Sequence, residues 1–210
     1  MPVINASTSG PGGIQMGGDA SGNLQLQSAG NTIATISSSG MAINTYTPST
    51  SLLTSGTAVS AGGTSTTLAT NLPSWVKRIT VIFNALNISS NIDTLVQLGT
   101  GSTPTYTVSG YSSTSGRFNY SSGTGGSSST TGFNICTIGG SSYNLSGSMV
   151  LHNISGNIWT SNHQLGAPGI PNAFVGGGVV TLGSILTAVR IASSDGSSTF
   201  TSGTVNIFYE

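Results

Sequence analysis

No stretch of this chain has the spacing of apolar side chains that an amphipathic helix needs. In every window of about a dozen residues, glycines or repeated β-branched residues interrupt the i, i+3, i+4, i+7 pattern. Short apolar runs rich in Val, Ile, Phe and Tyr alternate instead with clusters of Ser, Thr, Gly and Asn. Such runs suit a half-buried pleated surface, so we expect an all-β protein.

Ser, Thr and Gly supply 97 of the 210 residues, a bias that is typical of disorder when apolar residues are scarce as well. Here 36% of the residues are hydrophobic, which is adequate for a core in a chain of this length. The sequence therefore predicts a folded protein rather than a disordered one.

Formal charge is nearly absent and sums to zero. The charged residues are Asp19, Lys77, Arg78, Asp93, Arg117, Arg190, Asp195 and Glu210. Residues 118–189 carry none, so no basic stripe is available for a phosphate backbone, and we expect no nucleic-acid partner. A protein near zero net charge tends to self-associate, so we expect a hydroxyl-rich surface that is partly buried against copies of itself.

Residues 1–45 are expected to form an extended N-terminal arm of short strands. The arm contains strand patterns at residues 23–27, 31–37 and 41–44, separated by the turn sequences SAGN and SSSG. Strands this short bury too little to be stable alone. We therefore expect the arm to serve in oligomerisation or virion attachment, by pairing with equivalent arms or by lying along another protein.

Residues 46–69 are expected to be a Ser/Thr/Gly-rich connector with room for one or two strands, and residues 70–210 a separate domain. The alternation in residues 76–86 puts four apolar side chains on one face: Ile79, Val81, Phe83 and Ala85. Further strands are expected at residues 94–99, 132–138, 147–155, 157–162, 179–193 and 203–210. Residues 109–132 are expected to form a weak strand and a long exposed loop.

About eight strands with Gly-rich turns and no helix predict a β-sandwich, jelly-roll-like, preceded by the β arm. Trp75 and Trp159 are interpreted as residues of the core or its rim. The Asp195-Gly196 pair predicts a tight turn or short loop that leads into a final hairpin strand.

The sequence has no catalytic signature, and we expect no enzyme, metal or cofactor. His152 and His163 belong to no paired metal motif, although a site with Asp93 or Asp195 is an alternative. Four carboxylates leave little for a glycosidase pair. Cys136, the single cysteine, is expected to be a buried and inert thiol.

The opening residues lack the basic and apolar regions of a secretion signal, and nowhere do 18 apolar residues run together. We expect a chain that is made in a bacterial cytoplasm and does not insert into a membrane. This expectation argues against a free-standing lectin or secreted adhesin, which is the third function class considered.

Residues 72–100 and 186–210, LPSWVKRITVIFNALNISSNIDTLVQLGT and LTAVRIASSDGSSTFTSGTVNIFYE, resemble the C-terminal β-domain of bacteriophage tail-fibre-like and other virion surface proteins. Residues 17–40 are similar to the short β-repeat that precedes such domains. Residues 101–185 match only in Gly and Ser content and in position. The resemblance implies a non-enzymatic virion structural protein, usually a homotrimer.

Two placements on the virion are open. A fibre tip would bind a host surface glycan or protein through aromatic residues of the loop tract from Tyr106 to Tyr120, with Tyr106, Tyr111, Phe118 and Tyr120 as the candidate contacts. A capsid decoration or cement protein would instead stabilise the head through its arm. The expected partners are thus further copies of the chain and a tail or major capsid protein.

Overall fold

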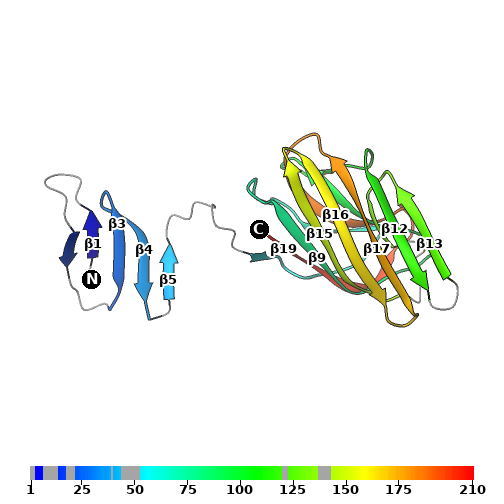
Figure 1. Ribbon diagram of the computed structural model, residues 1–210, viewed down its shortest axis with the longest axis horizontal. Helices are drawn as coiled ribbons and strands as arrows, with labels where there is room; N and C mark the ends of the chain where they lie inside the picture. Colours follow the sequence, from blue (N-terminus) through cyan, green and yellow to red (C-terminus); the bar gives the residue numbers. More distant parts are fainter. Residues whose placement is uncertain are drawn as a thin grey trace. The chain divides into compact units, whose positions relative to one another are not determined.

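The computed structural model describes residues 3–6, 14–17, 22–38, 40–43, 53–119, 123–136 and 143–210. Every regular element in these ranges is a β-strand, which confirms the all-β prediction. The chain divides into two compact units, Met1–Ser51 and Leu52–Glu210 (Figure 1).

The first unit is a five-stranded sheet in the order β2-β1-β3-β4-β5. Its strands are β1 (Val3–Ala6), β2 (Ile14–Gly17), β3 (Leu24–Ser28), β4 (Asn31–Ser37) and β5 (Gly40–Ile43). β1 and β3 are parallel, and the other neighbours are antiparallel. The turn between β3 and β4 consists of Ala29 and Gly30, both at positive φ (51° and 78°). This is the backbone that a two-residue hairpin turn requires.

The two faces of this arm sheet differ in polarity. The register places Leu24 opposite Ile36 and Leu26 opposite Ala34, and residues directly opposite each other share a face. The other face carries a hydrogen-bonded polar group in which Gln27 Nε2 donates to Thr32 Oγ1 at 3.3 Å. The arm sheet is therefore amphipathic.

The second unit is a β-sandwich. Its large sheet has the order β13-β12-β17-β16-β15-β9-β19-β6, with β7 also paired to β19. The strands are β6 (Thr54–Ser55), β7 (Val59–Ser60), β9 (Arg78–Ile88), β12 (Ser112–Asn119), β13 (Gly123–Ser129), β15 (Leu145–Ser155), β16 (Ile158–Ala167), β17 (Asn172–Thr181) and β19 (Phe200–Tyr209). Figure 1 faces this sheet.

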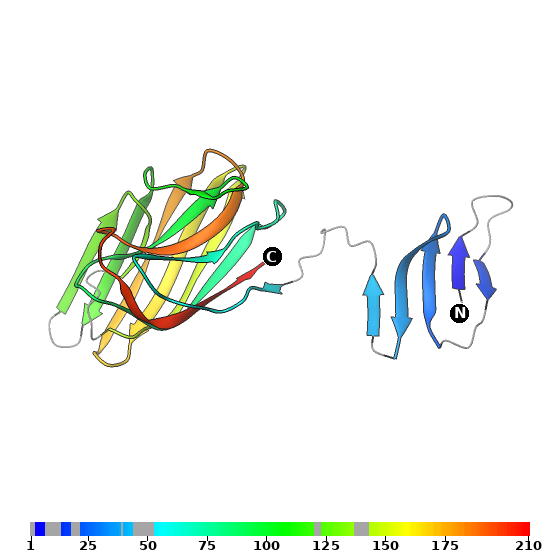
Figure 2. The ribbon, with the colours of Figure 1, turned by 180° about the vertical axis from the view of Figure 1, so that it is seen from behind.

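The small sheet has the order β11-β10-β18-β8, with β14 also paired to β10. Figure 2 shows the molecule from behind, on the side of this sheet. Its strands are β8 (Ser65–Ala69), β10 (Thr94–Thr100), β11 (Thr105–Tyr106), β14 (Phe133–Cys136) and β18 (Leu186–Ser193). The sandwich agrees with the predicted fold class, and its jelly-roll connectivity stays a prediction.

The two sheets enclose one hydrophobic core. Alternate residues of the large sheet supply Phe83, Leu151 and Phe174, and the small sheet supplies Leu98 and Ile191; each is at most 2% exposed. Strand alternation thus gives each sheet one apolar face, and the two faces cover each other.

The prediction that alternate residues from Ile79 onward share one buried face is correct as far as Phe83 and wrong at Ala85. The core position after Phe83 is taken by Leu86, which is 1% exposed. Ala85 has a φ of 51°, and the register with β15 shifts between Phe83 and Leu86. This β-bulge inserts one residue and reverses the alternation, which a period-two pattern does not anticipate.

Residues 109–132, expected as a weak strand and a long exposed loop, contain two paired strands instead, so the prediction of a long loop is wrong. β12 and β13 form a hairpin at the edge of the large sheet, and β12 pairs with β17 along its whole length. β17 contains Gly176, Gly177 and Gly178, and a Cβ on Gly178 would lie 2.6 Å from the Ser112 carbonyl oxygen. Glycine is required here because the strands approach closely, not because the chain turns.

The expected connector, residues 46–69, also contains paired strands where it is described. β6 and β7 pair with β19, and β8 pairs with β18. Residues 179–193, expected as one strand region, contain the end of β17 and the whole of β18 in different sheets.

Candidate functional site

One charged side chain lies on the middle strands of the small sheet. Arg190 of β18 is opposite Gln97 of β10 in the register. Its Nε donates to Gln97 Oε1 at 2.8 Å, and Gln97 Nε2 donates to the Thr131 carbonyl oxygen at 2.8 Å. Gln97 is 4% exposed. Both polar ends of this buried amide are therefore satisfied, and it orients the guanidinium.

Tyr106 holds the same guanidinium from a second direction. Arg190 Cζ lies 4.2 Å from the ring centroid, within the range of a cation–π interaction. The Tyr106 hydroxyl lies 3.1 Å from Thr67 Oγ1. A Cβ on Gly99 would stand 3.0 Å from Tyr106 Cδ1, so a larger residue at that position would push the ring away. Arg190 is thus positioned by both Gln97 and Tyr106.

A hollow of about 420 Å³ adjoins Arg190. Its lining includes Thr64, Leu95, Val108, Thr131, Arg190 and Asp195. Leu95 is 1% exposed and Val108 is 53% exposed, so the hollow has a buried apolar floor and an open apolar rim. This volume lies in the range of small-molecule sites.

Asp195 carries the negative charge at the edge of this hollow. Its Oδ1 accepts hydrogen bonds from the backbone N–H groups of Ser197 (3.0 Å) and Ser198 (2.9 Å), and its Oδ2 accepts one from Ser198 Oγ (2.7 Å). The hydrogen bonds from Ser198, followed by those from Ser197, hold the pKa of this carboxyl well below its usual range. The predicted turn at Asp195-Gly196 is present, with Gly196 at a φ of 67°. The hairpin expected with it is wrong, because β18 and β19 belong to different sheets.

His163 and Ser115 form a second polar pair inside the sandwich. His163 Nε2 lies 3.2 Å from Ser115 Oγ, and the two residues are 5% and 1% exposed. Within the described residues His163 Nδ1 has no hydrogen-bond partner. Burial lowers the pKa of the imidazole from 6.5 to about 4, so the ring is neutral near pH 7. The geometry is that of an internal contact, because no substrate reaches a buried serine.

Asp93, an alternative metal ligand from the sequence, is partly buried and engaged in hydrogen bonds. Its Oδ2 accepts hydrogen bonds from Ser127 Oγ at 2.7 Å and from Asn134 Nδ2 at 2.9 Å, which tie the β12–β13 hairpin to the small sheet. Cys136 nearby is fully buried, and burial, together with the Asp93 charge, raises the pKa of its thiol well above the usual range. Among the described residues, no three His, Cys, Asp or Glu side chains lie close enough together to hold a metal ion.

The structure separates the four aromatic residues predicted as a contact loop. Tyr111 is 3% exposed, its hydroxyl accepts a hydrogen bond from the Leu98 backbone N–H at 2.9 Å, and burial raises its pKa to about 12. Its ring also packs edge-on against Phe133, with centroids 5.0 Å apart. Tyr111 is therefore a core residue, and the expectation of an exposed side chain is wrong at this position.

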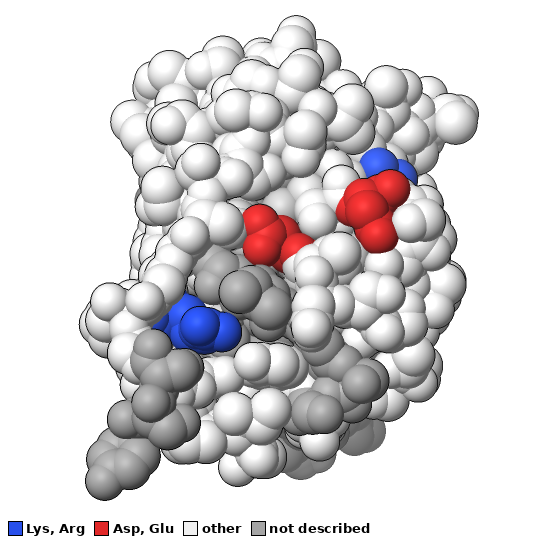
Figure 3. Space-filling model, turned by 90° about the vertical axis from the view of Figure 1, so that its right-hand side faces the viewer, with Lys and Arg blue, Asp and Glu red and all other residues white. Residues whose placement is uncertain are grey.

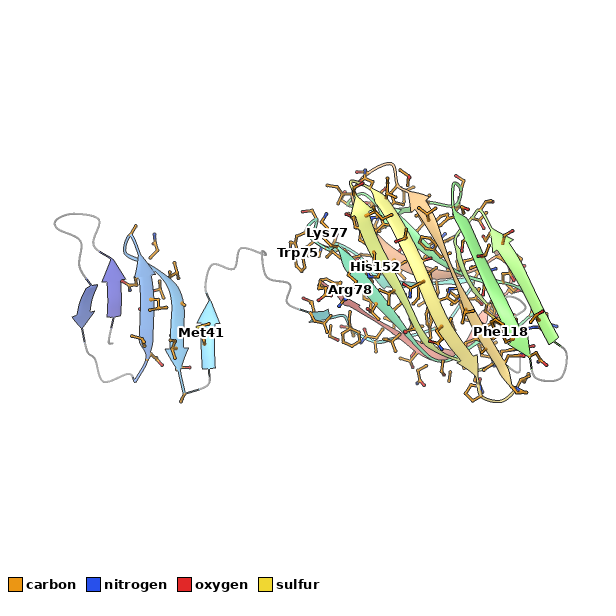
Figure 4. The ribbon with its side chains drawn as sticks, viewed as in Figure 1. Met41, Trp75, Lys77, Arg78, Phe118 and His152 are labelled. Carbon is orange, nitrogen blue, oxygen red and sulfur yellow. The ribbon has the colours of Figure 1, made fainter. Side chains whose placement is uncertain are left out.

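The other three aromatic residues have different surroundings. Tyr106 lies on the small sheet beneath Arg190, whereas Phe118 is 53% exposed on β12 of the large sheet. Tyr120 lies outside the described residues. Figure 4 places Phe118 well away from Lys77, Arg78 and His152 on the sandwich. Sequence proximity thus does not bring these side chains into one contact surface.

Both tryptophans pack as predicted. Trp159 is 3% exposed, and Trp75 is partly buried against the core with its ring centroid 6.1 Å from that of Tyr209.

Arg190 is the site residue that sequence reasoning missed. The signal for it was present, since a single arginine stands among the apolar and small residues of LTAVRIAS. On the face of the molecule drawn in Figure 3, charged side chains are sparse, and a basic and an acidic group lie side by side near its edge. Because the chain has four Lys and Arg residues among 210, a positioned cation is an unusual feature of this protein.

In comparisons with known proteins, no family model, no curated protein and no solved structure matches this chain. In the part of the chain that the structure describes, no helix is long and apolar enough to cross a membrane.

Proposed function

We propose that this protein is a non-enzymatic structural protein of a bacteriophage virion surface, a homotrimer whose arms associate and whose sandwich contacts the host surface. The observation that carries the proposal is the amphipathic arm sheet. Among the described side chains of this unit, Ala34 is the one buried apolar residue, while Ile36 is 38% and Met41 is 61% exposed. The apolar face therefore needs a second layer to be removed from water.

Further copies of the arm suit this role. Asp19 is the single charged residue before Lys77 in the sequence, so association of arms brings almost no like charges together. The edge strands β2 and β5 contain neither Lys nor Pro, the residues that commonly block edge pairing. The choice of three copies, and of a virion, rests on the resemblance of residues 72–100 and 186–210 to tail-fibre-like domains.

The sandwich supports the outward-facing half of the proposal. Its two sheets cover each other and form a core without a partner, so its outer surfaces are available for contact. Those surfaces are rich in Ser, Thr, Asn and Gly and poor in charge. A neutral, hydroxyl-rich surface limits nonspecific adhesion for a particle outside the cell.

The second candidate function is capsid decoration. The edge strands β2 and β5 favour it, because an unpaired edge can extend the sheet of another protein. In that case the arm lies along the major capsid protein and stabilises the head, and the sandwich contacts no receptor.

Antibody labelling of intact particles tests the two placements. An antibody raised against residues 52–210 is expected to label fibre tips in electron micrographs. Label spread over the head would favour decoration. Particles without any label would overturn the virion proposal and return the lectin class to consideration.

A further inference from the structure

We infer that the hollow beside Arg190 binds a saccharide that carries one carboxylate, such as a uronic acid unit of an acidic polysaccharide. The inference deepens the host-contact part of the proposed function. It rests on that proposal only for the biological source of the saccharide, because the site belongs to the sandwich alone.

The positive charge of Arg190 has no carboxylate partner among the described residues. In the described part of the chain, its guanidinium makes one hydrogen bond, through Nε, and no carboxylate lies within ion-pair distance. Its side chain is partly buried. Arginines that lose solvent contact are normally paired, since desolvation of a charge is costly. The two Nη amines thus lack the acidic partner that this side chain matches best.

Two neighbouring side chains fix the geometry of the Arg190 guanidinium. Gln97 holds Nε, and Tyr106 covers one face of the group at 4.2 Å. An arginine held in this way loses little conformational entropy when it binds a ligand. The planar fork then offers two parallel N–H groups to a carboxylate, which a lysine cannot do.

The lining of the hollow offers both polar and apolar contacts to a ligand. Thr64, Ser194 and Thr131 lie on its exposed walls and can hydrogen-bond to ring hydroxyls. Val108, which is 53% exposed, provides apolar area for the C–H face of a sugar ring. A volume of about 420 Å³ lies in the range that small-molecule ligands occupy, so a sugar unit is of suitable size.

The charges that line the hollow limit the charge of the ligand. Asp195 also lines the hollow, and its hydrogen bonds to Ser197 and Ser198 keep the carboxyl ionised at neutral pH. One cation and one anion leave no net positive charge for a polyanion such as a polyphosphate. A ligand with a single carboxylate and several hydroxyls fits this balance.

Saturation-transfer NMR on the purified full chain tests the inference with two probes, methyl β-glucuronide and methyl β-glucoside. They differ only at C6, where the glucuronide has a carboxylate and the glucoside a neutral hydroxymethyl group. The glucuronide is expected to bind at least about tenfold more tightly, the effect of one charge-assisted pair, and to weaken when salt is raised. Equal affinity for the two probes, or no transfer to either, would overturn the inference.

Variants separate the role of Arg190 from a general effect on folding. R190Q is expected to remove the preference for the glucuronide, and R190K to retain part of it because the charge remains without the fork. R78Q is the matched control, since Arg78 pairs with Glu210 on the large sheet and should leave both affinities unchanged. A preference that survives R190Q in folded protein contradicts the site. If R190Q does not fold, R190K and the salt dependence decide.

The outcome is separable from that of the proposed function. Saccharide binding by purified protein, together with particles that carry no antibody label, would remove the virion proposal and leave the site intact. Labelled fibre tips on a protein that binds neither probe would do the reverse.

Discussion

The arm sheet and the sandwich both consist of β-strands in which apolar and polar residues alternate, yet they bury apolar side chains to different extents. In the sandwich, Ile79, Val81 and Leu151 are fully buried because a second sheet covers them. In the arm, Leu24 and Leu26 of β3 are only partly buried, and Ile36 opposite Leu24 is 38% exposed. Alternation of apolar and polar residues is thus enough to form a strand, but a second layer decides whether its apolar face leaves water.

The largest expected effect comes from making the apolar arm face polar. The double substitution Ile36→Ser with Met41→Ser is expected to reduce the mass in light scattering from three chains to one at micromolar concentration. The reason is that both side chains lie on the face that we expect copies to cover. The melting temperature of the sandwich should not change.

Thr35→Ser is the control for this pair, since Thr35 is on the same strand but opposite Gln25 on the polar face. It should leave the mass at three chains. A wild-type chain that is a monodisperse monomer would contradict the trimer directly.

Within the sandwich, Gly176→Ala is expected to cost about 3 kcal/mol or more of unfolding free energy, measured by urea denaturation. A Cβ there would overlap the Thr114 carbonyl oxygen and lie 2.7 Å from His163 Cε1. Gly166→Ala in the neighbouring strand is the control, because no heavy atom lies within 4 Å of its Cβ position. Equal losses for both variants would show that close strand approach is not the reason for glycine in β17.

A smaller effect is expected from acid. Because burial lowers the pKa of His163 to about 4, the folded state holds fewer protons than the unfolded state below pH 6.5. Stability should therefore fall as pH drops from about 6.5 to 4, by about 2–3 kcal/mol from this group. His163→Gln should flatten this part of the profile in urea denaturation, whatever its effect at pH 7. An unchanged slope would rule out His163 as the acid-sensitive group.

The smallest effect concerns the ion pair between Arg78 and Glu210. The Arg78 side chain is 49% exposed, and ion pairs near the surface contribute little. Arg78→Gln is expected to change the unfolding free energy by less than about 1 kcal/mol. A larger loss in urea denaturation would mean that this end of β9 depends on the pair.

Much of the fold was predictable because it follows from local pattern. The strands predicted at residues 94–99 and 147–155 lie within β10 and β15, and the strand predicted at residues 157–162 overlaps β16, which begins at Ile158 and continues to Ala167. The burial of Cys136 was predictable for the same reason, since it lies in an apolar run. By contrast, β12 and β13 consist mainly of Ser, Thr and Gly and give only a weak strand signal of their own. Their pairing comes from the neighbouring strand β17 and from the partly buried hydrogen bond between Asn134 and Ser127.

The candidate site was less predictable than the fold. Arg190, Gln97 and Tyr106 are up to 93 residues apart, as the hydrogen bond between the first two shows. Sequence reasoning selected Tyr106 for a different reason and placed it on a loop with Tyr111, whereas strand pairing sets Tyr106 over Gly99 and directs Tyr111 into the core. Neighbours in a sheet are chosen by register, and register depends on the whole set of strands.

The sequence by itself determined the all-β class, the near absence of charge and most strand positions, because these depend on residue type and on spacings of two to a few residues. Only the tertiary structure decided which strands share a sheet, where the bulge at Ala85 reverses the alternation, and which cation adjoins a hollow. These properties depend on contacts between residues far apart in the chain. Their free energy is gained only when both layers are in place, and no local pattern records it.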